Sequence, residues 1–148
     1  MSSSDIQIAF IDTNVWLYAF VQGEDPSKHT VARGLLQRSE PIISTQVINE
    51  VCVNLLWKAS FSEEQIGELI GSFYEKYHVV QLNRSILLDA SGLRQRYSFS
   101  FWDSLIISSA LQSNVSVLYS EDMHDGLLVD GRLRIVNPFV NGRVQQSV

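Results

Sequence analysis

The sequence predicts a single α/β domain in which helices flank a central, mostly parallel sheet. The chain has 148 residues, of which 45% are hydrophobic, and this suits one domain with a sizeable core. Its first apolar run, residues 6–11, is continuous rather than alternating, as expected of a strand buried on both faces of a parallel sheet. Strand-like and helix-like segments then alternate, and no repeat or linker divides them.

Helix-start signals locate the elements in the first half of the chain. Asp25 followed by Pro26 is a good helix start, because the carboxylate accepts hydrogen bonds from free backbone amides and proline fits the first helical position. Ser44 or Thr45 can cap the next helix, and residues 62–65 form a capping box that opens another. The elements predicted here are strands at 6–11 and 41–43 and helices at 15–20, 25–38, 45–59 and 62–76.

The second half of the chain continues the alternation of strands and helices. The predicted elements are strands at 78–82, 116–119 and 133–136, the last of them weak, and helices at 83–96 and 101–113. An acidic loop, residues 120–126, follows the strand at 116–119. We expect an ordered core over about 6–138 and loose ends at 1–4 and about 141–148.

The composition indicates the cellular compartment but does not decide whether the protein binds nucleic acid. No apolar run approaches the ~20 residues that span a bilayer, residues 1–5 lack the basic region of a signal peptide, and one cysteine excludes an internal disulfide framework. We therefore expect a cytoplasmic protein without membrane contact. The formal charge of −5 argues against a nucleic-acid partner, but two divalent cations would add +4 and bring the sum to −1.

Two acids follow strands at what we expect to be the same edge of the sheet. Asp12 directly follows residues 6–11, and Asp122 lies in the loop after residues 116–119. Ligands gather at the carboxyl ends of parallel strands, and two carboxylates that face each other there cannot both stay ionised without a cation. The alternatives are a helix N-cap for Asp12 and solvated turn chemistry for Asp122.

Two further acids lie on predicted helices. Asp103 lies in the first turn of its helix above a buried stripe, so we expect it to point inward, although a capping box at residues 100–103 would also explain it. Glu50 faces away from the main apolar stripe of its helix, and a solvated side chain is the default expectation. Val53 and Trp57 lie on the same side as Glu50, so this helix could be covered on two faces.

Together these residues resemble the motifs of PIN-domain nucleases, and most closely the single-domain VapC-type toxins of bacterial toxin–antitoxin pairs. The likeness covers residues 6 to about 138 in the family's order and spacing. Each motif alone is weak, whereas four in one α/β domain of this length are specific. The motifs are Ile11-Asp12-Thr13-Asn14, Glu50 at the end of residues 44–50, Trp102-Asp103, and Ser120-Glu121-Asp122 with Gly126.

The resemblance implies one PIN domain over residues 1–148 with a catalytic Mg²⁺ or Mn²⁺ site. It replaces the expectation of a solvated Glu50 with that of a site residue. It also implies that Asn14 and Ser120 support the site by hydrogen bonding, with Asp125 as an accessory or alternative acid. The carboxylates that it assigns to metal binding, directly or through water, are Asp12, Glu50, Asp103 and Asp122.

The function implied is an endoribonuclease that hydrolyses RNA phosphodiester bonds as the toxin of a type II toxin–antitoxin pair. Its expected partners are RNA, a small antitoxin protein and a second copy of the chain. Mg²⁺ prefers oxygen ligands, and a bound metal eases the deprotonation of water and stabilises charge on phosphate. The alternative is a PIN-fold binding or scaffold module that does not cleave, and the presence of all four acids argues against it.

Other residues with possible roles have simpler interpretations. Cys52 lies in an apolar stripe and is expected in the core. The three histidines lack metal-ligand spacing, although His124 lies beside Asp122 and is a candidate for contact with substrate or metal. The three tryptophans, Trp16, Trp57 and Trp102, are expected as core or interface residues rather than base-stacking platforms.

Overall fold

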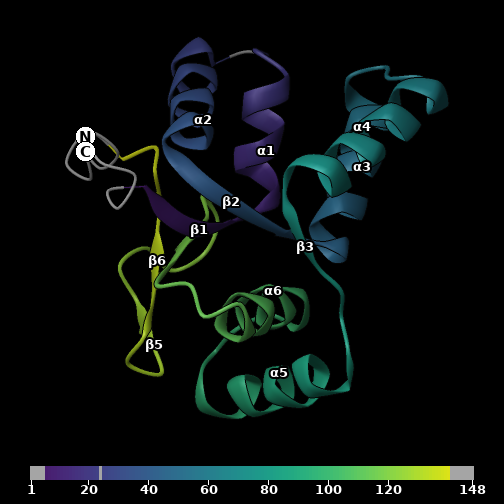
Figure 1. Cartoon of the computed structure of the whole chain (residues 1–148). Coiled ribbons are helices and arrows are strands. Elements are labelled where there is room, and N and C mark those ends of the chain that lie inside the picture. Colours follow the sequence, from purple (N-terminus) through teal and green to yellow (C-terminus); the bar gives the residue numbers. More distant parts are fainter. Residues whose placement is uncertain (1–5, 24, 141–148) are drawn as a thin grey trace.

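Helices cover both faces of a six-stranded sheet in the computed structural model, which describes residues 6–23 and 25–140 (Figure 1). The strand order is β3-β2-β1-β4-β6-β5. All neighbouring strands run parallel except β5, which is antiparallel to β6, so the predicted α/β class with a mostly parallel sheet is confirmed. The strands are β1 (Gln7–Ile11), β2 (Ser39–Ser44), β3 (His78–Val80), β4 (Val117–Tyr119), β5 (Leu128–Val129) and β6 (Leu133–Val136).

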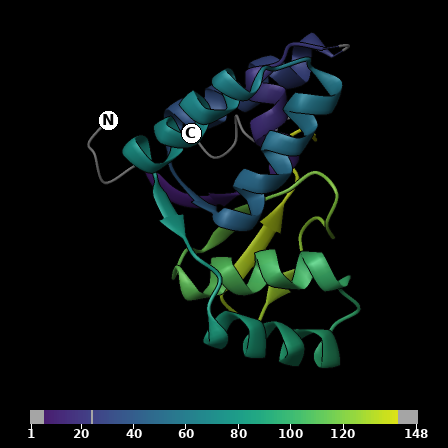
Figure 2. The same cartoon turned by 90° about the vertical axis from the view of Figure 1, so that its right-hand side faces the viewer.

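The helices form two groups on opposite sides of the sheet. Figure 1 shows α1 and α2 on one side and α5 and α6 on the other, and the turned view of Figure 2 agrees. Helix α3 packs against both α1 and α4, so α3 and α4 extend the group that contains α1 and α2. The bounds are α1 (Thr13–Phe20), α2 (Pro26–Arg38), α3 (Thr45–Lys58), α4 (Glu63–Lys76), α5 (Arg84–Arg96) and α6 (Phe101–Gln112).

The predicted capping residues begin the helices. Asp25 accepts hydrogen bonds from the backbone amides of Ser27 and Lys28 at the start of α2, with Pro26 in the first turn. The side chain of Ser44 caps α3, and residues 62–65 form both bonds of the capping box that opens α4. The loops into these helices are therefore short and fixed.

Three elements have a boundary that lies two residues from the predicted one, and other boundaries differ by at most one residue. Helix α1 begins at Thr13 rather than at residue 15, because Asp12 caps it directly after β1. Strand β2 spans Ser39–Ser44 rather than 41–43, since its first residues pair with β1. Strand β3 ends at Val80, two residues early. The predicted loose ends, 1–4 and about 141–148, lie outside the described residues.

Strand β5 is missing from the prediction. It forms a short hairpin with β6 around Asp130 and Gly131, whose φ angles are 50° and 70°. Arg132 N donates to Val129 O at 3.0 Å and closes the turn. An Asp-Gly pair between apolar residues is a strong hairpin signal, so the sequence contained the information.

The core lies on both sides of β1 and β4. Phe10, Ile11 and Leu118 are completely buried, and Trp16 from α1 is buried beside them, as predicted for a core tryptophan. Burial of each such side chain stabilises the fold by roughly 1.5–3 kcal/mol, and this fixes the pairing of Ile11 with Tyr119. Cys52 is also buried, as predicted. None of the helices in the described ranges is long and apolar enough to cross a membrane.

Candidate active site

Asp12 lies at the carboxyl edge of the sheet, between two neighbouring parallel strands. Because Ile11 pairs with Tyr119, the residues that follow β1 and β4 emerge side by side. Ser120 Oγ donates to Asp12 Oδ2 at 2.7 Å, and Thr13 N donates to Asp12 Oδ1 at 2.7 Å. The expected meeting of the loops after these two strands is therefore present. Asp12 also caps α1, so the N-cap interpretation from the sequence is confirmed.

Glu50 on α3 faces the sheet edge, against the expectation from helical periodicity. Thr13 Oγ1 donates to Glu50 Oε1 at 2.6 Å, and Gln46 Nε2 donates to Glu50 Oε2 at 3.2 Å. The default expectation of a solvated Glu50 is therefore wrong. Periodicity failed because α3 is covered on two sides, and the second side meets the start of α1. Thr13 and Gln46 were not recognised from the sequence as partners of this site.

Asp103 and Asp122 complete the acidic cluster, which is defined here as Asp12, Glu50, Asp103 and Asp122. Asp103 lies in the first turn of α6, where its backbone amide donates to Ser100 Oγ at 3.1 Å. Asp122 is exposed and accepts a hydrogen bond from Asn14 Nδ2. Electrostatic repulsion links Asp103 to Asp122, Glu50 and Asp12, so Asp103 is the member of the cluster that interacts with the other three.

Asp125 has a different position from Asp122. Its Oδ1 accepts a hydrogen bond from Asn137 N at 2.8 Å, and the Asn137 side chain reaches Glu121 O at 3.5 Å. Asp125 therefore helps to attach the acidic loop, residues 120–126, to the segment after β6. Of the two candidates for the fourth acid, Asp122 is the one that contacts Asn14.

Burial and repulsion from neighbouring carboxylates make the ionised forms of Asp12 and Asp103 unfavourable. Asp12 is only 7% exposed, and burial raises its pKa to about 6, because the effect of burial exceeds the lowering by the hydrogen bonds from Ser120 and Thr13. Repulsion from Glu50 and Asp103 adds a smaller rise. Partial burial also raises the pKa of Asp103, and Asp122 and Glu50 add to that rise. A positive charge placed among these groups would relieve both effects.

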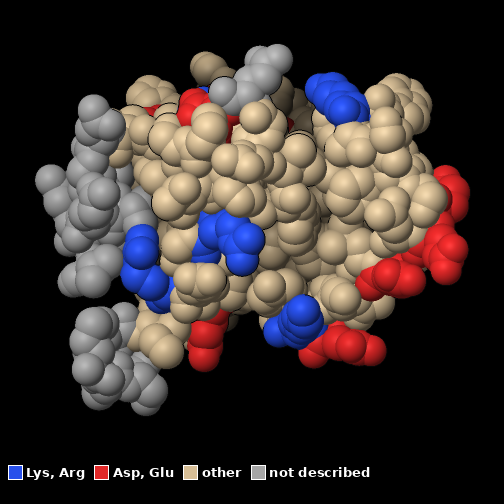
Figure 3. All heavy atoms as spheres, turned by 90° about the horizontal axis from the view of Figure 1, so that it is seen from above, with Lys and Arg blue, Asp and Glu red and all other residues tan. Residues whose placement is uncertain are grey.

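No lysine or arginine supplies that charge within the part of the chain that the structure describes. The two ion pairs found there join Lys28 to Glu121 and Arg96 to Asp130, and neither involves the acidic cluster. Figure 3 shows one face of the molecule, on which Lys and Arg are scattered, most of them among uncharged residues and one beside acidic residues. The compensating charge would therefore have to come from a bound ion or a partner.

The donor set fits a hard divalent cation that keeps part of its hydration shell. All four side chains offer carboxylate oxygens, which suit Mg²⁺ and Mn²⁺. Gln46 adds a buried Oε1 that has no hydrogen-bond partner among the described residues. No three His, Cys, Asp or Glu side chains of the described residues are placed to hold one ion together, so simultaneous direct ligation by three requires side-chain rotation. Mg²⁺ keeps several waters, through which the remaining carboxylates can bind it.

A second set of contacts holds the acidic loop against α1 and α2. Lys28 Nζ forms an ion pair with Glu121, and Tyr18 Oη donates to the same carboxylate at 2.9 Å. Lys28 Nζ also lies over the rings of Tyr18 and Phe139, 5.0 and 5.7 Å from their centroids. Glu121 is adjacent to Asp122, so these contacts fix the backbone that presents Asp122. They join residues about 100 positions apart and gave no local sequence signal.

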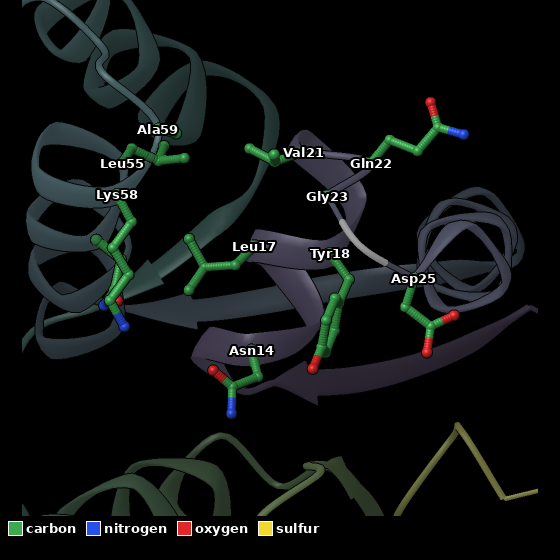
Figure 4. Close-up of a pocket in the computed structure, with 11 residues that line it drawn as sticks. Asn14, Leu17, Tyr18, Val21, Gln22, Gly23, Asp25, Leu55, Lys58 and Ala59 are labelled. Carbon is green, nitrogen blue, oxygen red and sulfur yellow. The ribbon is translucent and has the colours of Figure 1, made fainter.

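Two hollows adjoin the acidic cluster. An apolar hollow of about 400 Å³ lies between α1 and α3 and reaches Asn14 at one end. Figure 4 shows Leu17 and Val21 directed toward α3, with Leu55 on the opposite wall. A second hollow of about 540 Å³ is bordered by Asp103 and Asp122 themselves. The cluster is therefore open to a ligand on the side of Asp103 and Asp122, while the apolar hollow comes no closer than Asn14.

The comparison with protein families gives a match over most of the chain. The model of the PIN domain family matches residues 9–124, a range that contains the whole acidic cluster. No curated protein sequence matches the chain.

Solved structures from several bacteria share the fold. A chain of a toxin–antitoxin complex from Klebsiella pneumoniae is 20% identical, with a TM-score of 0.68, and the match covers 88% of this chain and 98% of that one. The Mycobacterium tuberculosis VapC20 toxin, described as cleaving the sarcin–ricin loop, is 17% identical, with a TM-score of 0.64 and coverage of 77% and 89%. A chain of Rickettsia felis VapBC2 bound to promoter DNA is 20% identical, with a TM-score of 0.60 and coverage of 88% and 98%. At these identities the likeness shows the fold alone.

Proposed function

Because this chain belongs to the PIN domain family, we propose that it is a Mg²⁺- or Mn²⁺-dependent endoribonuclease that hydrolyses RNA phosphodiester bonds. We propose further that it is the VapC-type toxin of a type II toxin–antitoxin pair. The similar folds of a Klebsiella toxin–antitoxin chain and of a Mycobacterium toxin that cleaves the sarcin–ricin loop support this assignment.

The observation that carries the proposal is the convergence of the acidic cluster from four separate segments. Its members follow β1, lie on α3, begin α6 and follow β4, and no lysine or arginine of the described residues pairs with them. A fold that needed only stability would gain nothing from this repulsion. A divalent cation bound among these carboxylates would remove the repulsion and could then attract a phosphate.

Each polar neighbour of the cluster has a definable task in this proposal. Ser120 and the Thr13 amide fix the two oxygens of Asp12, and Thr13 Oγ1 with Gln46 fixes those of Glu50. These bonds hold the carboxylates in place before any ion binds. A divalent cation held by the cluster would stabilise charge on the phosphate and make water easier to deprotonate.

RNA cleavage in the presence and absence of a chelator tests the proposal. The wild-type protein should cut single-stranded RNA with Mg²⁺ or Mn²⁺, and both a chelator and Asp12→Ala should abolish cutting. Asp89→Asn is the matched control, because Asp89 is an exposed carboxylate on α5 outside the cluster. Cleavage that survives both the chelator and Asp12→Ala would refute a metal-dependent nuclease at this site, and binding without cleavage would favour the scaffold alternative.

The proposed protein partners are a small antitoxin and a second copy of the chain. Structures of a toxin–antitoxin complex and of VapBC2 with promoter DNA share this fold, which supports the antitoxin. The exposed side chains of Trp57 and Val53 on α3 and of Tyr74 and Ile70 on α4 offer apolar surface for a homodimer. The molar mass in solution, measured by light scattering for wild type and Trp57→Glu, tests the second partner: a wild-type monomer would contradict it.

A further inference from the structure

The hollow of about 540 Å³ beside the acidic cluster has walls that suit a nucleobase. Besides Asp103 and Asp122, it is lined by residues 97–100, which join α5 to α6, and by Met123, His124 and Leu127 from the loop after β4. We propose that this hollow, called here the aromatic subsite, binds one unpaired base of the RNA next to the phosphodiester that is cut. The inference rests on the ribonuclease function proposed above and adds how the substrate is held.

Two stacked aromatic rings form one wall of the aromatic subsite. The rings of Tyr97 and Phe99 lie nearly parallel, with centroids 5.0 Å apart and an interplanar angle of 18°. Both side chains are partly exposed and both line the hollow. Unpaired RNA bases stack on such rings, and every base has a face that can do so. The wall therefore offers a flat apolar surface of the kind that holds a base.

The ring of Tyr97 is fixed before any ligand arrives. Asp130 N donates to Tyr97 Oη at 2.9 Å, and Tyr97 Oη lies 3.2 Å from Asp130 Oδ1, to which it donates. Arg96 Nη2 binds both oxygens of the same carboxylate, at 3.1 and 2.9 Å. A platform held in this way loses little conformational freedom when a base stacks on it.

The remaining lining selects a base rather than a phosphate. None of the residues that line the aromatic subsite is a lysine or an arginine, so it lacks the permanent positive charge that usually holds a phosphate. Met123 and Leu127 add apolar surface, while Ser98 and His124 are exposed and can bond to the edge of a base. Small-molecule sites have this mixture of apolar walls and a few polar groups, in volumes of about 300–1,000 Å³.

The position of the subsite places the base close to the bond that is cut. Asp103 and Asp122 belong both to the wall of the subsite and to the acidic cluster. A phosphate at the cluster and a base in the subsite therefore belong to the same nucleotide or to neighbouring ones. A base within a duplex cannot enter such a hollow, so the subsite predicts cleavage in single-stranded segments or loops.

Removal of one base at a time from the substrate tests the subsite during cleavage. The probe is a single-stranded oligoribonucleotide with one mapped cleavage position, together with copies that carry an abasic nucleotide at each flanking position. For wild type, one abasic position should lower kcat/KM by roughly 10- to 100-fold. Phe99→Leu should cut the intact RNA about as slowly as wild type cuts that abasic copy, with no further loss on the abasic copy.

The control is Phe101→Leu, which changes an exposed aromatic residue on α6 outside the subsite. It should keep the wild-type dependence on the base. Equal abasic losses in wild type and Phe99→Leu would overturn the subsite, as would the absence of any sensitive position. An effect of Phe99→Leu on antitoxin affinity alone, with wild-type behaviour toward RNA, would assign the hollow to a protein partner and would also overturn it.

A binding measurement separates the subsite from the cleavage chemistry. The fluorescent base 2-aminopurine is placed at each position of the same RNA in turn, and fluorescence is measured with a chelator present. Stacking should quench the signal at one position for wild type and Phe101→Leu, and much less for Phe99→Leu. Quenching without cleavage under any metal condition would support the subsite and refute the proposed function. Cleavage without Phe99-dependent quenching would refute the subsite alone.

Phe99 packs against the core, so its substitution could also disturb folding. A second variant therefore tests the subsite without changing Phe99. His124 is exposed, so His124→Ala should fold normally. It should flatten the preference among the four bases at the sensitive position by several-fold, with the metal requirement unchanged. An unchanged base preference in His124→Ala, together with failure of Phe99→Leu to fold, would count against the subsite.

Discussion

Asp12 combines a structural role with its place in the acidic cluster. One carboxylate oxygen caps α1 through the Thr13 amide, and the other accepts from Ser120. Burial raises the pKa of Asp12 to about 6, so the ionised form is costly at neutral pH when no cation is bound. A residue kept only as a helix cap would not require this burial, since caps are commonly exposed. The cost is consistent with a residue retained for function.

The raised pKa of Asp12 predicts how stability depends on pH. The unfolded chain releases the proton near pH 3.8 and the folded chain near pH 6, so the folded state binds more protons between these values. The free energy of unfolding therefore falls as pH rises through this window, by roughly 1–3 kcal/mol for the metal-free protein. Asp12→Asn removes this fall and can still cap α1.

Urea denaturation with a chelator present, at several values between pH 4 and pH 7.5, measures this effect. Asp12→Asn should be more stable than wild type above pH 6 and equal to it near pH 4. Asp89→Asn, the exposed control, should follow the wild-type curve. Parallel curves for wild type and Asp12→Asn across the whole range would show that Asp12 carries no such penalty.

We expect the Thr13 hydroxyl to support RNA cleavage by holding the Glu50 carboxylate in place, without binding a metal itself. Thr13→Val keeps the shape of the side chain but loses the 2.6 Å bond to Glu50, so the carboxylate is no longer held. Loss of a group that orients a metal ligand typically costs 10- to 100-fold in activity, and we expect about 10-fold here in kcat/KM for RNA cleavage. Thr30→Val is the control, since the Thr30 side chain is exposed and donates to Pro26 O within α2. Equal activity of the two variants would contradict the role.

At the scale of elements, the order of the strands creates the site. Because β1 lies beside β4, Asp12 and Ser120 leave the sheet together, and this could be predicted from apolar runs that end in polar residues. Asp103 could also be predicted, since it stands above a buried helical stripe. Glu50 could not be placed by periodicity, because the second covered side of α3 depends on tertiary packing.

The remaining gaps in the prediction have similar causes. The contacts of Glu121 with Tyr18 and Lys28 join distant segments and leave no periodic pattern. The short strand β5 is different, because the Asp130-Gly131 turn is a local hairpin signal from which β5 could have been predicted. Local patterns therefore account for most of the elements, whereas the partners that orient the carboxylates depend on the assembled fold.

The attachment of the acidic loop by Lys28 predicts a local effect. Lys28→Met keeps the length of the side chain but removes the ion pair with Glu121, so residues 120–126 should open more often. Amide hydrogen exchange in this loop should become roughly fivefold faster, as expected from the loss of ~1 kcal/mol of local stability. Lys76→Met, at the end of α4, should leave the exchange unchanged. Unchanged exchange in Lys28→Met would show that Lys28 does not hold the loop.

At the scale of the whole molecule, the net charge of −5 and the acidic cluster both oppose the approach of a negatively charged RNA. Without cations the negative charge would weaken the binding of RNA, and on the proposed function a bound divalent ion would reverse the field only where the phosphate binds. Activity should therefore depend on the site rather than on general attraction to RNA. The exposed apolar residues on α3 and α4 leave surface for protein partners without covering the aromatic subsite.

Growth of a bacterial host tests the proposed biological role. Expression of the chain alone should arrest growth, and co-expression of its small protein partner should restore it. Asp103→Asn should abolish the arrest, because it removes one carboxylate of the cluster and keeps the start of α6. Growth is followed by optical density, with expression checked by immunoblot. Arrest that persists unchanged in Asp103→Asn would place the toxicity elsewhere.

The most direct test of a single catalytic cluster is a set of cleavage measurements on single and double variants. Asp12→Asn, Glu50→Gln, Asp103→Asn and Asp122→Asn should each lower kcat/KM for Mn²⁺-dependent RNA cleavage by at least about 100-fold. Pairs of these substitutions should cost little more than either alone, because the four residues act as one unit. Asp89→Asn should cleave like wild type. Wild-type cleavage by any one of the four single variants, or fully multiplicative losses in the pairs, would contradict a shared site.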